Sequence, residues 1–247
     1  MSKTARIRLF VDLPLTEGQA VTFAEEQSRY LASVMRLTVN DEVLLFNGRD
    51  GEFVAVLTAV GKKNVQAEVC RQTRPFAAGE DIWLLFAPVK KDRTDYIIEK
   101  ATELGVKKII PVITRHTITD RVRTERFAAQ AAEAAEQSRR LDVPQIGEAV
   151  RLETLLSGWE PDRRLFFMDE SGRGAPARQA FAAYRGASAV LVGPEGGFSD
   201  EELADLRSKP FAVAVSLGPL ILRAETAVAA SLSLWQAVGG HWDGEEK

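Results

Sequence analysis

The sequence predicts an α/β fold in which a C-terminal parallel-sheet domain follows a small β-barrel. From residue 82 onward, apolar strand patterns alternate with helical patterns, whereas residues 1–72 contain short strands separated by turn signals. Residues 73–81, which include Pro75 and Gly79, form the predicted linker. We therefore expect two domains, one over residues 1–72 and one over residues 82–247.

The N-terminal module is predicted to be a strand meander that carries one helix. Its expected strands span residues 6–11, 43–46, 53–60 and 65–69. Turn signals such as Asn47-Gly48 and Asp50-Gly51 lie between them, and residues 28–36 have helical spacing. Small barrels of this kind often bind nucleic acids, so the arginines of this module are candidate phosphate contacts. A solvated surface role remains the alternative for each arginine.

The C-terminal domain is predicted from strands and helices that alternate along the chain. Its expected strands span residues 82–87, 108–113, 165–168, 189–192 and 211–217. Its expected helices span residues 93–104, 124–140 and 224–238, with another beginning at Ser199. The run at 189–192 is uninterrupted and apolar, which is typical of a strand buried on both faces of a parallel sheet.

Composition narrows the class of protein. The chain has 247 residues, a net charge of −3, one cysteine (Cys70) and two histidines (His116 and His241). One cysteine excludes an internal disulfide and a cysteine-cluster metal site, and we expect no metal site. The net charge argues against a protein that coats nucleic acid non-specifically. Without an apolar run long enough to span a bilayer and without a signal-peptide core, we expect a cytoplasmic protein.

Two glycine-bearing loops follow consecutive strands in the C-terminal domain. Residues 189–202 read AVLVGPEGGFSDEE, and residues 211–227 read FAVAVSLGPLILRAETA. Each is a strand, a glycine loop and a helix start, and Ser199 with Glu202 matches a capping box. Loops at the carboxyl ends of parallel strands line the crevice where ligands bind. Ordinary turns remain the alternative, because GPEGG matches neither dinucleotide nor P-loop motifs.

Together the two loops resemble the cofactor-binding end of the SPOUT class of RNA methyltransferases. The match is closest to the RsmE family, which methylates N3 of a uridine in small-subunit (16S) ribosomal RNA. YLASVMRL resembles the signature helix of the family's PUA-like barrel, and DYIIEKATELGVKKIIPVIT resembles its first helix-strand unit. AEQSRRLDVPQI resembles the segment after its long helix, except that Arg139 replaces a usual small residue.

Three further residues depart from the family pattern. Leu220 stands where an arginine is usual, Ala224 where threonine is common and Tyr30 where histidine is common. Roles that rest on that arginine or on an imidazole are therefore not carried over to this chain.

The resemblance implies a trefoil knot, S-adenosylmethionine bound in bent form among three loops, and a homodimer. It implies 16S ribosomal RNA or the small ribosomal subunit as the partner, and no membrane. The residues expected at the cofactor are Met168, Leu191, Gly193, Glu195, Gly196, Gly197, Leu217, Gly218, Leu222, Ala224 and Thr226.

Methylation of uridine N3 requires loss of the imide proton and stabilisation of the anionic uracil. Arg223 is the candidate for that stabilisation. Glu225 lies in the first turn of a helix, where the dipole favours its charged form, so we expect it to orient substrate or cap the helix rather than act as base. The candidate RNA contacts are Arg6, Arg8, Arg36, Arg115 and Arg140.

Two other functions remain open at this point. One is an RNA-binding module that keeps the barrel and the cofactor pocket but has lost catalysis, which the Leu220 and Tyr30 departures suggest. The other is a nucleotide-binding α/β enzyme that acts on a small molecule.

Overall fold

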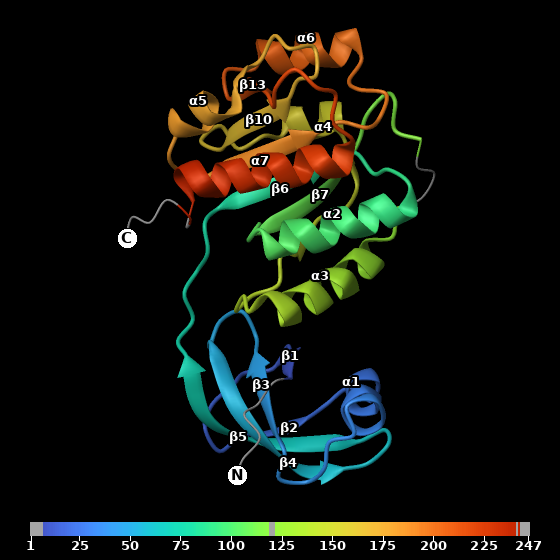
Figure 1. Ribbon diagram of the computed structural model, residues 1–247, viewed down its shortest axis with the longest axis vertical. Coiled ribbons are helices and arrows are strands. Elements are labelled where there is room, and N and C mark those ends of the chain that lie inside the picture. Colours follow the sequence, from blue (N-terminus) through green and yellow to red (C-terminus); the bar gives the residue numbers. More distant parts are fainter. Residues whose placement is uncertain (1–6, 119–121, 241, 243–247) are drawn as a thin grey trace. The chain divides into compact units, whose positions relative to one another are not determined.

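The computed structural model describes residues 7–118, 122–240 and 242 of the chain. It divides into two compact units (Figure 1). The N-terminal unit comprises residues 1–78 together with 135–143, and the C-terminal unit comprises residues 79–134 and 144–247. The chain thus re-enters the N-terminal unit after it has begun the C-terminal one. None of the helices in the described ranges is both long and apolar enough to cross a membrane.

The N-terminal unit is built on a five-stranded sheet with the order β1-β3-β4-β5-β2. The strands are β1 (Arg8–Phe10), β2 (Ala20–Thr22), β3 (Glu42–Phe46), β4 (Glu52–Val60) and β5 (Val65–Arg74). β1 and β3 are parallel, and the other neighbours are antiparallel. Alternate residues of β5, such as Val65 and Ala67, are buried because successive side chains point to opposite faces. All five strands contribute to one apolar core.

The helical segment of this unit differs from the expected single helix. It consists of α1 (Glu25–Arg29) followed directly by a π-helical turn, η1 (Tyr30–Val34). Tyr30 packs against the core from its partly buried position. Arg36 then adopts a φ of 53°, and the left-handed conformation ends the helical segment.

The C-terminal unit contains a parallel sheet, as predicted. Its strand order is β11-β13-β10-β12-β6-β7-β8, and β9 also pairs with β7. The strands are β6 (Ile82–Phe86), β7 (Lys108–Ile113), β8 (Gln145–Ile146), β9 (Val150–Arg151), β10 (Arg164–Met168), β11 (Ala175–Pro176), β12 (Ser188–Val192) and β13 (Ala212–Ser216). All five residues of β12 are buried, which confirms the prediction of a strand covered on both faces.

Helices cover both faces of this sheet. They are α2 (Lys91–Glu103), α3 (Thr124–Ser138), α4 (Leu152–Ser157), α5 (Ala177–Ala182), α6 (Asp200–Ser208) and α7 (Ala224–Gly239). α4 and α6 pack on one face through Leu152, Leu156 and Leu206, whereas α7 packs with α2 and α5 on the other (Figure 1). Since all the strands are parallel, their carboxyl ends meet at one edge of the sheet. The predicted glycine loops lie at that edge.

Candidate functional site

A cavity of about 430 Å³ lies at the carboxyl ends of β10, β12 and β13. Three loops line it: residues 168–171 after β10, the GPEGG loop after β12, and residues 217–223 between β13 and α7. Its volume is in the range of small-molecule sites. The two loops predicted to converge therefore do so.

Eight of the eleven residues expected at the cofactor line this cavity. They are Met168, Gly193, Glu195, Gly197, Leu217, Gly218, Leu222 and Ala224. The walls combine backbone from the glycine loops with apolar side chains, and Arg223 also lines the cavity. Such a lining suits a ligand that is read through its shape and through backbone hydrogen bonds.

Three expected residues do not line the cavity. Leu191 is fully buried in the core beneath the face that α4 and α6 cover, because its side chain points into the sheet packing. Gly196 turns its carbonyl toward His116. Thr226 is exposed on α7, since Ala224 and Ala227, three residues apart, form the helix face toward the cavity. The structure thus does not bring Leu191, Gly196 or Thr226 to the cavity lining, and their contact with the cofactor stays a prediction.

Gly197 is fixed by both its backbone and its surroundings. Its φ is +68°, which L side chains rarely adopt, and a Cβ there would lie 2.3 Å from Oε1 of Glu170. The exposed Glu170 side chain could turn away from such a Cβ, so the backbone conformation is the stronger reason for a glycine at this position.

The predicted capping box at the start of α6 is confirmed, and its Glu202 also connects two loops near the cavity. The Ser199 hydroxyl accepts a 3.2 Å hydrogen bond from the backbone N–H of Glu202, and Glu202 accepts one of 2.8 Å from the N–H of Ser199. The second oxygen of Glu202 accepts a 2.8 Å bond from the N–H of Arg115. The loop after β7 is thereby joined to the end of the GPEGG loop.

His116 reinforces the same connection. Its Nδ1 lies 3.0 Å from the Gly196 carbonyl oxygen and 3.1 Å from that of Gly197. Because both partners are acceptors, Nδ1 carries the proton. The residue is exposed, yet it also holds the GPEGG loop.

Arg93 is a second residue that sequence reasoning missed. It lies in the first turn of α2, and its Nη1 donates a 3.0 Å hydrogen bond to Glu195. Its Nε lies 3.6 Å from Oε1 of Glu225, whose other oxygen is buried with no hydrogen-bond partner among the described residues. Glu225 therefore pairs with Arg93, and no side-chain hydrogen bond caps α7.

Arg223 is exposed beside the cavity. No ion pair or side-chain hydrogen bond engages its guanidinium within the part of the chain that the structure describes. A charged group that lines a cavity without an internal partner is available to a ligand.

Asp169 directly follows β10 and lines the cavity, and its side chain is almost completely buried. Burial alone would raise the pKa of Asp169, but hydrogen bonds from Ser171 and from Arg207 outweigh burial and hold that pKa below its usual value of 3.8. Nη2 of Arg207 lies 2.6 Å from the Asp169 carboxylate. The loop after β10 is thus anchored to α6 by a charged pair.

The predicted RNA contacts separate into exposed and buried arginines. Arg36 and Arg115 are exposed, and no ion pair engages either side chain in the described ranges. Arg6 lies outside the described residues. The side chain of Arg140 is only 12% exposed and pairs with Asp142 at 3.0 Å, so the structure argues against a phosphate contact there.

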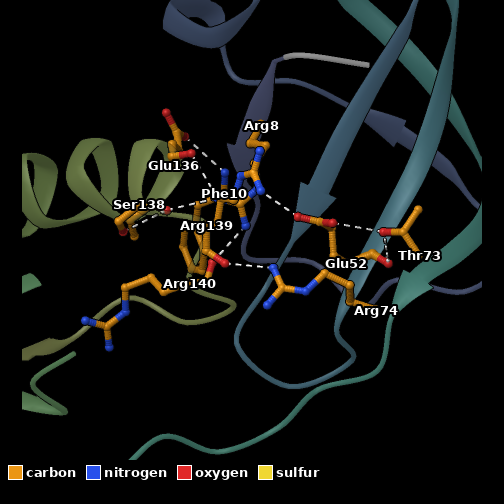
Figure 2. Close-up of polar contacts among 10 residues, drawn as sticks. Arg8, Phe10, Glu52, Thr73, Arg74, Glu136, Ser138, Arg139 and Arg140 are labelled. Atoms are coloured by element: carbon orange, nitrogen blue, oxygen red, sulfur yellow. Dashed lines mark hydrogen bonds and ion pairs between the residues drawn. The ribbon is translucent and has the colours of Figure 1, made fainter. Parts of the chain in front are cut away.

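Arg8 has a structural role instead of the predicted contact with phosphates. Its guanidinium pairs with Glu52 at 2.7 Å and donates to the carbonyl oxygens of Ala135, Glu136 and Arg140 (Figure 2). It also lies 4.5 Å from the ring centroid of Phe46. These contacts use the guanidinium inside the N-terminal unit, where it holds residues 135–143 against β1 and β4.

Comparison with known proteins identifies the family. Residues 78–236 match the model of an RNA methyltransferase domain, and residues 23–70 match that of an RNA methyltransferase PUA domain. The chain is 33% identical to the ribosomal RNA small subunit methyltransferase E of Rickettsia conorii, over 95% of this chain and 96% of that protein. The chain belongs to the ribosomal RNA small subunit methyltransferase E family, RsmE.

Solved structures of RsmE relatives share the complete fold. The enzyme of Neisseria gonorrhoeae, solved with S-adenosylmethionine, has a TM-score of 0.88 and 28% identity and covers 96% of this chain and 99% of its own. A Legionella pneumophila putative methyltransferase, also solved with that cofactor, has a TM-score of 0.85 and 28% identity and covers 95% and 98%. The predicted SPOUT and PUA-like architecture is thus confirmed at the level of the fold.

Proposed function

We propose that the protein transfers a methyl group from S-adenosylmethionine to N3 of a uridine in 16S ribosomal RNA. Membership in the RsmE family and two relatives solved with this cofactor support the proposal. The observation that carries it is the cavity at the carboxyl ends of β10, β12 and β13. Both glycine loops meet there beside Arg223, which has no ion-pair partner among the described residues.

The cavity fits S-adenosylmethionine in size and in chemistry. Backbone of Gly193, Gly197 and Gly218 can bond the adenosine, and Leu217 and Leu222 supply apolar walls. The left-handed backbone of Gly197, which a residue with a Cβ rarely adopts, shapes the loop that lines the cavity. When bound there, S-adenosylmethionine supplies an electrophilic methyl group on a sulfonium.

The chain's own residues have three tasks in this reaction. The loops orient the target uracil for in-line attack, and such alignment can account for much of the rate enhancement. Arg223 stabilises the negative charge that develops on the uracil once N3 loses its proton. Glu225 is not among the residues that line the cavity, and its second oxygen is buried; held by Arg93, it positions the start of α7 beside Arg223.

We also propose how the parts of the chain share the work. The N-terminal domain, residues 1–72, contacts RNA through Arg36, and the C-terminal domain, residues 82–247, holds the cofactor and contacts RNA through Arg115. The insertion of β13 between β10 and β11, which are consecutive strands of the chain, supports a threaded, knotted arrangement around the cavity. The enzyme works in the cytoplasm, on the RNA or on the small ribosomal subunit.

A homodimer is part of this proposal. Leu220 and Ile221 are 77% and 83% exposed beside the cavity, and Leu234 of α7 is 38% exposed. A second copy that covered these side chains would remove apolar surface from water and complete the site. Sedimentation at micromolar concentration should give the mass of a dimer; a monomer mass would overturn this part.

The test of the function is methyl transfer from labelled S-adenosylmethionine to small ribosomal subunits that lack the modification, in parallel with their deproteinised RNA. Nucleoside analysis should identify N3-methyluridine. Arg223→Gln should lower kcat by about 10²–10³ while it leaves cofactor affinity nearly unchanged, because Arg223 acts on charge that develops in the transition state.

Other outcomes would change the assignment. Label in a different nucleoside would overturn the N3 assignment. Cofactor binding without label in either substrate would favour the inactive RNA-binding module that Leu220 suggests. Membership in an RNA methyltransferase family argues against an enzyme acting on a small molecule.

A further inference from the structure

A second cavity of the C-terminal unit, about 440 Å³, is lined by positive charge. It lies between the segment that joins β6 to α2 and the beginning of α3. Its apolar lining includes Val89 and Phe127, which are 6% and 3% exposed. Four cationic side chains complete the lining: Lys90, Lys91, Arg123 and Arg126. We call this the basic cavity.

Most of this charge has no ion-pair partner among the described residues. No ion pair engages Lys90, Lys91 or Arg123 within residues 7–118 and 122–240. Arg126 pairs with Asp95 at 2.7 Å, which neutralises one charge. Asp92 and Glu125 are exposed nearby in the sequence but do not line the cavity. Three cations at one concave site are the arrangement that binds phosphate groups.

The basic cavity is adjacent to the cofactor cavity through one turn of α2. Lys91 begins that helix and lines the basic cavity. Arg93, two residues further along, donates its hydrogen bond to Glu195, which lines the cofactor cavity. The first turn of α2 therefore contributes both to the lining of the basic cavity and to the contact that holds a loop of the cofactor cavity.

We propose that the basic cavity binds backbone phosphates of the RNA strand next to the target uridine. The proposal rests on the proposed function and deepens it by assigning a second substrate contact. The cations there contact phosphates and not base edges, so they fix the position of the strand without reading its sequence. Binding at this cavity is accordingly electrostatic and sensitive to salt.

The test compares two double variants of the full-length protein that remove equal charge. The variant Lys91→Gln/Arg123→Gln removes two of the cationic side chains that line the basic cavity. The matched control, Arg151→Gln/Arg178→Gln, removes two exposed cations of the same unit that also lack ion pairs in the described ranges. Affinity for fluorescein-labelled oligouridylate and for deproteinised small-subunit RNA is measured by anisotropy over a salt series. Cofactor affinity is measured in parallel.

The basic-cavity variant, Lys91→Gln/Arg123→Gln, should bind both RNAs about tenfold more weakly near physiological salt. Its slope of log Kd against log salt concentration should fall by about 1.4, because each of the two lost phosphate contacts on a single strand contributes about 0.7. The control should match the wild-type protein, and neither variant should change cofactor affinity. Lys91→Arg/Arg123→Lys, which keeps the charges, should restore RNA affinity. Equal losses in the two glutamine variants, or an unchanged salt slope, would overturn the proposal.

RNA binding is measured here without methyl transfer, so the two proposals fail separately. A wild-type protein that binds RNA through this cavity but makes no N3-methyluridine would overturn only the reaction. A wild-type protein that makes N3-methyluridine while the basic-cavity variant binds RNA with full affinity would overturn only the phosphate site. A basic-cavity variant that binds oligouridylate with full affinity but binds deproteinised small-subunit RNA more weakly would show that the cavity does not contact the phosphates of a single strand, and would also overturn it.

Discussion

Arg93 donates a 3.0 Å hydrogen bond to Glu195 and thereby joins the first turn of α2 to the GPEGG loop after β12. The same guanidinium lies 3.6 Å from Glu225 at the start of α7. One side chain therefore links the beginnings of two helices with a loop of the cofactor cavity. Since all three partners are partly accessible, the contacts serve to set geometry more than to stabilise the fold.

Arg93→Gln should weaken S-adenosylmethionine binding by up to about tenfold, equivalent to about 1.4 kcal/mol, because the GPEGG loop loses its tie to α2. The free energy of unfolding should change by less than about 1 kcal/mol, as for other partly exposed pairs. Calorimetric titration and urea unfolding measure the two quantities. Lys100→Gln is the control, since Lys100 lies on the same helix and pairs with Glu99 and Glu103 away from the site. Equal cofactor affinity in both variants would contradict the linking role of Arg93.

Gly197→Ala should lower cofactor affinity as well as stability. The left-handed backbone costs about 1–2 kcal/mol for a residue with a Cβ, and the exposed Glu170 carboxylate would have to turn away from the new methyl group. Gly172→Ala is the matched control, because Gly172 has a similar φ of +72° but no atom within 4 Å of a Cβ. Thermal unfolding should shift in both variants, and the dissociation constant of the cofactor should rise only in Gly197→Ala. If both variants bind the cofactor alike, the backbone conformation of Gly197 is not needed for the site.

Arg207→Gln should change how stability depends on pH. The folded-state pKa of Asp169 lies below its usual value of 3.8, so its contribution to stability is present above the unfolded-state pKa and is lost as the pH falls through the folded-state pKa. Without Arg207 the folded-state pKa rises toward the unfolded value. The difference in unfolding free energy between wild type and variant should therefore be largest above about pH 4 and should shrink in more acidic solution.

Urea unfolding from pH 2.5 to pH 7 measures this difference. Arg178→Gln, which removes an exposed arginine without an ion pair in the described ranges, should give a constant offset across that window. An Arg207→Gln difference that grows toward low pH would contradict the assignment of the pair.

Arg8 and Arg36 should respond in opposite ways to loss of charge. Arg8→Gln leaves the buried Glu52 carboxylate without its cation and should destabilise the protein by about 3–5 kcal/mol. Arg36→Gln should stay within about 0.5 kcal/mol of the wild-type unfolding free energy, because Arg36 is exposed, while it weakens RNA binding. Thermal unfolding and RNA anisotropy, applied to both variants, separate the two roles. An Arg8→Gln protein with wild-type stability would show that the network in Figure 2 is not essential.

The longer elements could be predicted because each carries its own periodic signal. The strand at 108–113 and the start of the last helix at Ala224 agree with β7 and α7, and β12, β10 and β6 agree to within one residue at each end. Some short strands were not predicted. They are β2, β8, β9 and β11, which have two or three residues each, too few to show a hydrophobic periodicity. β5 continues to Arg74, inside the predicted linker, because it pairs with β4 at Glu52.

The site was predictable only where local sequence defines it. Glycine spacing and the capping box located the loops, since those features depend on neighbouring residues. Arg93 and His116 contact partners that are 102 and 80 residues away in the sequence, and no local sequence pattern predicts such contacts. Arg8 was misassigned for the same reason: an arginine in an amphipathic strand is usually exposed, and its acceptors lie more than a hundred residues later.

The return of residues 135–143 to the N-terminal unit affects how this protein can be made and divided. A ribosome synthesises the first five strands well before residues 135–140, whose carbonyl oxygens accept hydrogen bonds from Arg8. The Arg8 guanidinium can therefore form these bonds only after the start of the second unit has also been synthesised. A gene fragment that stops at residue 78 would leave Arg8 with Glu52 but without those acceptors. The N-terminal unit is therefore not a portable module: recombination could not transfer it intact as one uninterrupted stretch of coding sequence.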